Sequence, residues 1–185
     1  MKKIFFLVML ALVFTSCSKL SALSNLFDCE VETLKNAKKI TDFKKNFSLE
    51  IPSNWKTAFY FDKFQSELFT ADTVKQLSDT FILDASFNFG NLNFDSDFLK
   101  KTDSILTRNS FQKINEGSIS FKSKPAYWYL IKGSKKGFTY HQLNLLVIIS
   151  NTTYFKAYTD IYGDENIDAR ICSSISILEK LEFLQ

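Results

Sequence analysis

Only one histidine, His141, offers an imidazole for acid–base chemistry. It lies in Tyr140-His141-Gln142-Leu143, where polar and apolar residues alternate as in a strand. A serine nucleophile would need this base beside a serine and an acid, and no Gly-x-Ser-x-Gly turn occurs in the sequence. We therefore expect a structural histidine and no catalytic residue. If Cys17 carries a lipid, as its position after the N-terminal apolar run indicates, one histidine and two cysteines remain, too few for the common zinc sites.

The densest group of acidic residues runs from Asp160 through Asp164 and Glu165 to Asp168. Oxygen-rich clusters suit calcium, but the spacing differs from that of an EF-hand loop. The same residues fit a strand end, a turn at Gly163 and the N-terminus of a helix, where the dipole favours acidic side chains. No glycine-rich phosphate loop is present either. We therefore predict no metal and no cofactor.

An aromatic run, Pro125-Ala-Tyr127-Trp128-Tyr129, is the best candidate for a binding surface. On a strand, alternation places Tyr127 and Tyr129 on one face and Trp128 on the other. Together with Trp55, these residues could line a groove for a peptide, a glycan or a lipid. The alternative is core packing beneath a helix.

The first seventeen residues, MKKIFFLVMLALVFTSC, have the three parts of an export signal. A basic start precedes the apolar run 4–14, which is short for a membrane span, and small residues lead up to a cleavage point after Ser16. With Cys17 at the next position, the segment resembles a bacterial lipoprotein signal. That resemblance implies lipidation of Cys17. Ser18, with no acidic run after it, implies the outer membrane, facing the periplasm.

The remaining cysteines, Cys29 and Cys172, would then lie in an oxidising compartment. Neither belongs to a Cys-x-x-Cys motif, which argues against a redox pair. We predict a disulfide that joins the two ends of the domain and contributes roughly 4–5 kcal/mol in the chain-entropy model. Two free thiols are the alternative.

Length and composition indicate one ordered domain. The chain has 185 residues and a formal net charge of +3, part of which lies in the signal, so charge predicts no nucleic-acid partner. Twenty Phe and seven Tyr against two Pro and five Gly favour a packed core. We predict a signal peptide over 1–16, a short lipidated tether over 17–27 and a single domain over 28–185.

Hydrophobic periodicity predicts a helix over 28–39 and a second helix from 93 or 95 to 108. Residues 111–114 and 118–121 are expected to form a hairpin around a turn at 115–117. A closing amphipathic helix follows from residue 167. The other expected strands are 47–51, 55–61, 67–71, 81–89, 126–132, 138–149 and 153–160.

This order predicts an α/β (α+β) fold in which helices on both faces sandwich an antiparallel sheet, as a three-layer sandwich. Residues 145–149 are apolar on both faces, so their strand should be central.

The segment Phe47-Ser-Leu-Glu-Ile-Pro-Ser-Asn-Trp55 resembles the opening strand and Pro-x-x-Trp turn of the Mog1/PsbP-like fold. The strand meander and closing helix fit the same layout, so the resemblance covers about residues 45–182. Members of that fold are mostly accessory or assembly proteins. The resemblance supplies no functional residue for this chain.

We therefore expect a lipid-anchored periplasmic accessory or binding protein of the cell envelope. It would be non-enzymatic, held to the membrane by its N-terminal lipid, and would engage an envelope protein partner. The alternative is a small-ligand or lipid-binding lipoprotein with an aromatic-lined pocket. An envelope hydrolase using His141 or the acidic cluster is a third reading.

Overall fold

The computed structural model describes residues 22–184, so the predicted signal peptide and Cys17 lie outside the described residues. Residues 22–27, expected to be tether, instead fold onto the domain. Helix α2 (Ala22–Leu26) buries Leu23, and the ring of Phe27 meets that of Trp128 edge-on, with centroids 4.9 Å apart. None of the helices in the described part is both long and apolar enough to cross a bilayer.

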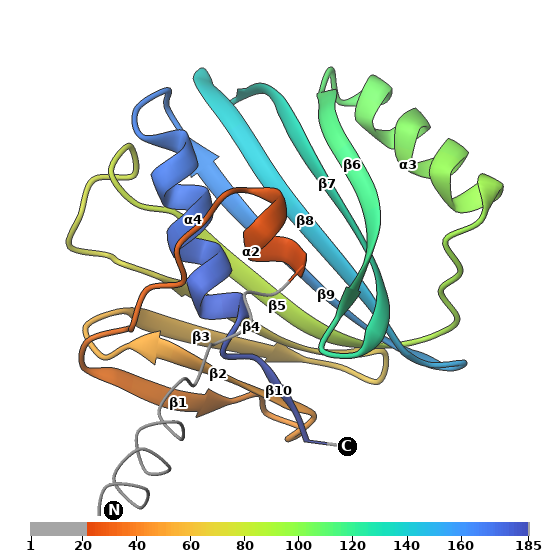
Figure 1. Ribbon diagram of the computed structural model, residues 1–185, viewed down its shortest axis with the longest axis horizontal. Coiled ribbons are helices and arrows are strands. Elements are labelled where there is room, and N and C mark those ends of the chain that lie inside the picture. The colour runs from red at the N-terminus through yellow and green to blue at the C-terminus, as the bar shows by residue number, and fades with distance from the viewer. Residues whose placement is uncertain (1–21, 185) are drawn as a thin grey trace, which may run out of the picture.

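A seven-stranded antiparallel sheet with the order β3-β4-β5-β9-β8-β7-β6 forms the centre of the fold (Figure 1). Alternation gives this sheet an apolar and a polar face. On β8, for example, Leu143 and Leu145 face the main core, whereas Gln142 and Asn144 face the other way. The strands are β3 (Lys56–Phe61), β4 (Gln65–Ala71), β5 (Ile82–Phe89), β6 (Gln112–Phe121), β7 (Lys124–Lys135), β8 (Phe138–Ser150) and β9 (Thr153–Tyr162).

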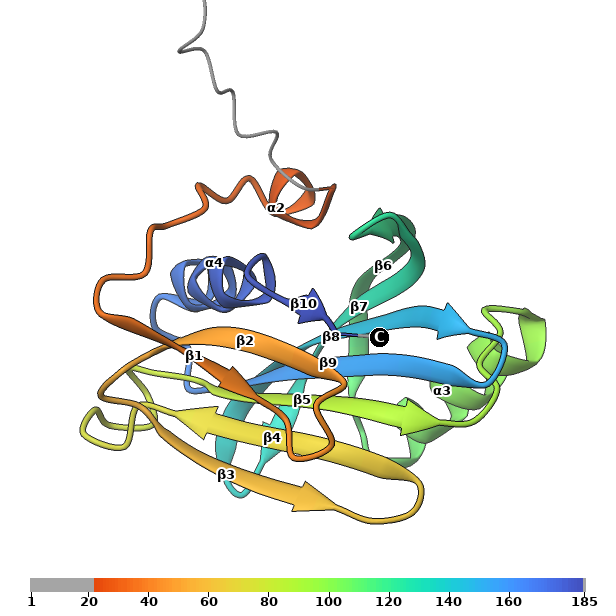
Figure 2. The same ribbon diagram turned by 90° about the horizontal axis from the view of Figure 1, so that it is seen from below.

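Helices α2 and α4 (Ile167–Leu178) cover the apolar face together with a small sheet (Figure 2). Ile171 and Ile175 of α4 are buried in the main core. The small sheet is built from β1 (Ala37–Thr41), β2 (Phe47–Pro52) and β10 (Glu182–Phe183). Its β2 strand supplies Phe47, whose ring packs edge-on against Phe155 of β9 with centroids 5.2 Å apart.

Helix α3 (Ser96–Arg108) covers part of the polar face. It begins as the sequence predicts, because the Asp95 side chain accepts a hydrogen bond from the backbone N–H of Phe98 at 2.9 Å. Leu106 is buried against Ile131 and Tyr140. Helices therefore lie on both faces of the sheet, which confirms the predicted fold class.

The helix predicted over 28–39 is wrong: this segment contains an extended stretch and then β1. A disulfide joins Cys29 to Cys172 of α4, and the backbone N–H of Glu32 donates to the Ser176 hydroxyl at 3.0 Å. These links hold the segment along α4, and residues 37–41 pair with β2 in register. Tertiary pairing overrides the weak helical spacing.

The hairpin predicted around residues 115–117 is also wrong, because β6 runs through this region as one strand. The pairing with β7 shifts in register between Lys113 and Asn115, as at a β-bulge. Gly117 lies within β6, where it allows the Trp128 side chain to pack close to the backbone, and it does not form a turn. A Cβ atom at this position would lie 3.2 Å from the indole Nε1 of Trp128.

Candidate functional site

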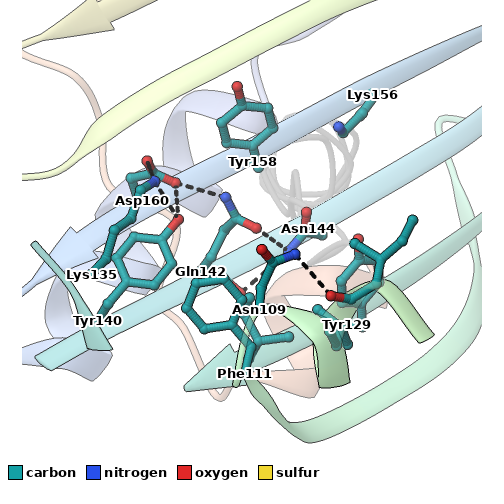
Figure 3. A pocket seen from close by; sticks show the side chains of 13 residues that line it. Asn109, Phe111, Tyr129, Lys135, Tyr140, Gln142, Asn144, Lys156, Tyr158 and Asp160 are labelled. Carbon is teal, nitrogen blue, oxygen red and sulfur yellow. Dashed lines mark hydrogen bonds and ion pairs between the residues drawn. The ribbon is translucent and has the colours of Figure 1, made fainter. Parts of the chain in front are cut away.

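A pocket of about 320 Å³ opens on the polar face of the sheet, where the end of α3 meets β7, β8 and β9 (Figure 3). We call it the α3 pocket. Aromatic rings form much of its wall and amide and charged groups lie between them, a mixture typical of small-molecule sites. The lining residues are Ile105, Leu106, Asn109, Phe111, Tyr129, Ile131, Lys135, Tyr140, Gln142, Asn144, Lys156, Tyr158 and Asp160.

Asp160 is the centre of the polar network in this pocket. Its Oδ1 accepts hydrogen bonds from the Tyr140 hydroxyl at 2.5 Å and from Gln142 Nε2 at 2.8 Å. Its Oδ2 accepts from Lys135 Nζ at 3.0 Å, which makes an ion pair. Burial and the neighbouring carboxylate of Asp160 raise the pKa of Tyr140 far above its usual value, so Tyr140 stays a neutral donor. The carboxylate is therefore occupied by its own neighbours.

The orientation of two amides follows from Asp160. Because an ionised carboxylate only accepts hydrogen bonds, Gln142 must present its NH₂ group to it. The Gln142 Oε1 atom then accepts from Asn144 Nδ2 at 3.0 Å. Register places Gln142 opposite Asp160, and Asn144 opposite Tyr158, on the adjacent strand β9. The chain of bonds fixes the Asn144 amide and leaves its Oδ1 as an acceptor for a ligand.

Two donors in the pocket have no protein acceptor within the described part of the chain. The Tyr129 hydroxyl makes no hydrogen bond there, and burial raises the pKa of Tyr129 to about 12, so it remains protonated. The Lys156 ammonium lies 4.9 Å from the centroid of the Tyr158 ring and forms no ion pair with residues 22–184. The α3 pocket thus offers an acceptor, a neutral donor and a cation to a bound group.

The network around Asp160 predicts a measurable loss of stability. Asp160→Asn removes the ion pair with Lys135 and places an NH₂ group beside the donors of Tyr140 and Gln142. We expect the free energy of unfolding to fall by about 2 kcal/mol in urea unfolding, the usual cost of leaving buried partners unsatisfied. Asp164→Asn, at an exposed position in the following turn, should change it by less than about 0.5 kcal/mol. Equal effects of the two changes would contradict the network.

Gly133 fixes the position of the Phe111 ring in the pocket wall. A Cβ atom at residue 133 would lie 2.4 Å from Cδ1 of Phe111 and 3.2 Å from the carbonyl oxygen of Ser110. Gly133→Ala should therefore push this ring aside and cost about 1–3 kcal/mol in urea unfolding, as overpacking does. Gly137→Ala in the next turn is the contrasting case. It has open space around it but a φ of +83°, so it tests backbone strain instead of overpacking. If the clash is with the Phe111 ring, adding Phe111→Leu should restore stability to Gly133→Ala but not to Gly137→Ala.

The aromatic residues named from the sequence do not form one surface. Tyr129 lines the α3 pocket, whereas Tyr127 is buried beneath α3 against Phe98 and donates to the Glu116 carboxylate. Trp128 points to the opposite face, into the main core. Trp55 lines a separate cavity of about 220 Å³ together with Phe81 and Arg170. Of the four candidates, only Tyr129 belongs to the α3 pocket.

His141 lies on the apolar face, at the edge of a hollow beside the start of α4. Its side chain is buried, and burial lowers the pKa of the imidazole below its usual value. The Nδ1 atom makes no hydrogen bond within the described chain, so no serine or carboxylate is joined to it there. Within residues 22–184, no three His, Cys, Asp or Glu side chains gather as metal ligands would.

Sequence reasoning missed most of the α3 pocket. The sequence places Asp160 at the end of a strand, as part of an acidic cluster, but does not predict that it faces Gln142 on the neighbouring strand. A signal is present, because Tyr140, Gln142 and Asn144 occupy alternate positions of β8. Three polar residues at that spacing indicate a second, polar face with its own partners.

No family model matches the sequence, and no curated protein is similar to it in sequence. Solved structures do resemble the fold. The solution structure of the cyanobacterial PsbP protein CyanoP from Synechocystis matches with a TM-score of 0.56 and 10% identity, covering 84% of this chain and 96% of CyanoP. The fold is therefore PsbP-like, as the resemblance of residues 47–55 implied.

Two further structures complete the comparison. A crystal structure from Bacteroides thetaiotaomicron matches with a TM-score of 0.54 and 15% identity, over 82% of this chain and 50% of that protein. LpqN, described as involved in cell envelope biogenesis of Mycobacterium tuberculosis, matches with a TM-score of 0.46 and 12% identity, over 91% of this chain and 99% of LpqN. Identities this low establish the fold alone.

Proposed function

We propose that this chain is a lipid-anchored accessory protein of the cell envelope, non-enzymatic, which uses the α3 pocket to hold a side chain of an envelope protein partner. Cys17 carries the lipid and keeps the domain on the periplasmic side of a membrane, with the outer membrane as the expected site. The signal-like residues 1–17 support this address. The disulfide between Cys29 and Cys172 supports an oxidising compartment.

The observation that carries the proposal is that the polar groups of the α3 pocket are hydrogen-bonded to one another. Asp160, its only acidic lining residue, accepts from three neighbours, and the two amides are held by the bonds that follow. A general base must be within reach of a substrate proton, and this carboxylate is already surrounded by donors. A rigid pocket with a fixed acceptor and donors is suited to recognition. Its volume, about 320 Å³, is at the small end for ligands and suits one side chain or one small molecule.

The anchor is tested by replacing Cys17. Cells fed an alkyne fatty acid should label the wild-type protein, and Cys17→Ser should abolish the label and move the protein out of the membrane fraction. One or more acyl chains at roughly 0.8 kcal/mol per buried methylene would account for that retention. Equal labelling of Cys17→Ser would contradict lipidation at this residue.

The partner is tested by photocrosslinking of the full-length protein in cells. A photoreactive amino acid replaces Ile105, an exposed residue of the α3 pocket wall, and the control replaces Ala169, which is exposed on α4 across the sheet. We expect one stoichiometric envelope protein from position 105, identified by mass spectrometry, and none from position 169. The same products from both positions would contradict a partner bound at the pocket.

A small ligand is the second candidate, and the position of Tyr129, one of the four aromatic residues named from the sequence, in the wall of the α3 pocket favours it. In that case native mass spectrometry of the purified protein should show a bound small molecule. The paired change Tyr129→Phe and Lys156→Met removes the unpaired donors and should lose it. No captured protein and no bound molecule would overturn both candidates.

A further inference from the structure

Four exposed phenylalanines gather at one end of the strands, away from the α3 pocket. Phe43 lies in the β1–β2 turn, Phe61 ends β3, Phe64 lies in the β3–β4 turn and Phe89 ends β5. The strands that these turns and ends belong to are labelled in Figure 2. The four phenylalanine side chains are 59%, 48%, 60% and 41% exposed, respectively. The rings of Phe43 and Phe61 stack with centroids 3.8 Å apart, and the N–H of Phe89 donates to the carbonyl of Phe64 at 2.8 Å. We call these four residues the Phe tip.

The turns that carry the Phe tip are rigid. Asp42 accepts hydrogen bonds from the backbone N–H of Asn46 at 2.6 Å and of Phe47 at 2.8 Å. Asp62 accepts from the N–H of Phe64 at 2.7 Å and of Gln65 at 2.9 Å. Such aspartate turns hold the chain in one conformation. The hydrogen bonds of Asp42 and Asp62 therefore fix the turns from which Phe43 and Phe64 point outward.

The area of the Phe tip is that of the largest apolar patch on a typical monomer. Phenylalanine buries about 150–250 Å² when it is fully enclosed, so four half-exposed rings leave roughly 400 Å² of apolar surface. Patches of about this size on single proteins are often functional. Turn positions are also where Gly, Asn, Asp and Ser are usual, so exposed phenylalanines there need a reason.

Lysines surround the Phe tip. The Lys44 ammonium lies 5.0 Å from the centroid of the Phe89 ring, and that of Lys63 lies 4.7 Å from the Phe64 ring. Lys45 is exposed in the first turn. The acids of the two turns, Asp42 and Asp62, face the backbone N–H groups described above. The Lys44 ammonium also donates to the Asp62 carbonyl, so Lys45 and Lys63 are the exposed lysines of the two turns. Three lysines against two aspartates give the turns a formal net charge of +1.

We propose that the Phe tip inserts into the headgroup region of a bilayer that contains anionic phospholipids, with the exposed Lys45 and Lys63 at the phosphates. Apolar side chains such as phenylalanine bury at the boundary between headgroups and acyl chains, and each lysine near an anionic surface adds to binding. The contact rests on the lipid anchor of the proposed function, which keeps a bilayer within reach of the domain. It would give the anchored protein a fixed orientation on the membrane.

The test uses the full lipidated protein in vesicles and a tryptophan at the tip. Phe64→Trp adds a fluorophore to the tip, and Phe138→Trp adds one at the β7–β8 turn, where the phenylalanine is also exposed. Emission of the wild type, with Trp55 and Trp128, is subtracted. The vesicles contain phosphatidylcholine alone or with phosphatidylglycerol, and some of the acyl chains are brominated to quench tryptophan at the bilayer surface.

We expect quenching of Phe64→Trp in the anionic vesicles, and neither in neutral vesicles nor for Phe138→Trp in either. Adding Lys45→Gln and Lys63→Gln to Phe64→Trp should weaken the contact roughly 30-fold, from the loss of two lysines at an anionic surface. Absence of quenching, or equal quenching at positions 64 and 138, overturns the proposal. The Phe tip would then be expected to bind a protein partner.

Flotation of the same samples separates this result from failure of the anchor. A lipidated protein floats with both kinds of vesicle, whatever the tip does. If the protein floats with neither, the anchor and the tip contact both fail. If it floats with the anionic vesicles alone and Phe64→Trp is quenched there, the anchor fails and the tip contact stands.

Discussion

The change Asp84→Asn is expected to raise the free energy of unfolding by roughly 3–5 kcal/mol at pH 8 and to leave it nearly unchanged at pH 4. Asp84 lies in the middle of β5 with 0% of its surface exposed, and neither carboxylate oxygen accepts a hydrogen bond within the described chain. A buried carboxylate is costly to ionise when no hydrogen bond or ion pair compensates for the loss of water. Asparagine has the same shape without the charge.

The pH dependence follows from the pKa of Asp84. Burial raises this pKa from 3.8 to about 8, and the Glu67 carboxylate acts in the same direction, against the opposing effects of the Tyr158 hydroxyl and Lys156. Below about pH 4 the acid is protonated in both the folded and the unfolded chain, so it has no effect on stability. Between about pH 4 and pH 8 the folded chain retains the proton more strongly, and stability falls as the pH rises. The asparagine variant lacks this fall.

The measurement is urea unfolding at pH 4, 6 and 8 for the wild type, Asp84→Asn and the exposed control Asp164→Asn. The wild type and the control should lose stability with rising pH, and their curves should converge on that of Asp84→Asn at pH 4. A parallel pH dependence in all three proteins would contradict the prediction, because it would show that the pKa of Asp84 is not raised in the folded chain.

The position of Asp84 connects this cost to the candidate site. Asp84 pairs with Tyr158 across β5 and β9, and Tyr158 lines the α3 pocket. A buried acid with a raised pKa beside a pocket is typical of functional sites.

The elements that the sequence predicts well are those whose own residues determine them. Alternation along residues 138–160 predicts β8 and β9, and Asp95 marks the start of α3. The fold class follows, because short turns require antiparallel neighbours and helices flank the strands in the chain. These signals are local in the sequence.

The elements that were predicted wrongly depend on distant contacts. β1 forms because residues 37–41 pair with β2 and Cys29 is tied to α4, and neither contact has a local signal. The α3 pocket is similar. Its network requires Gln142 to lie opposite Asp160, and a shift of one residue in the pairing of β8 and β9 would turn the two side chains to opposite faces. The pairing register of β8 and β9 therefore determines which side chains meet in the α3 pocket, and this register is known only once the sheet is assembled.

Removal of the disulfide by Cys29→Ala and Cys172→Ala is expected to lower the free energy of unfolding by about 4–5 kcal/mol. The bond closes a loop across a sequence separation of 143, so its loss frees many conformations of the unfolded chain. Cys29 is buried, and alanine in place of each sulfur keeps the site apolar. Urea unfolding of the oxidised wild type, the reduced wild type and the double variant measures the effect, and a loss below about 1 kcal/mol would contradict it.

The same experiment separates the two faces of the sheet. The disulfide lies with α4 on the apolar face, whereas the α3 pocket lies on the other, so the folded double variant should keep the crosslink expected from position 105. The reduced wild type should match the double variant in stability.

A loss of 4–5 kcal/mol is a large part of the free energy of unfolding of an ordinary domain, and it corresponds to about a thousandfold change in the ratio of folded to unfolded chain. Such a dependence would make full stability conditional on an oxidising compartment, and so would tie the fold to export.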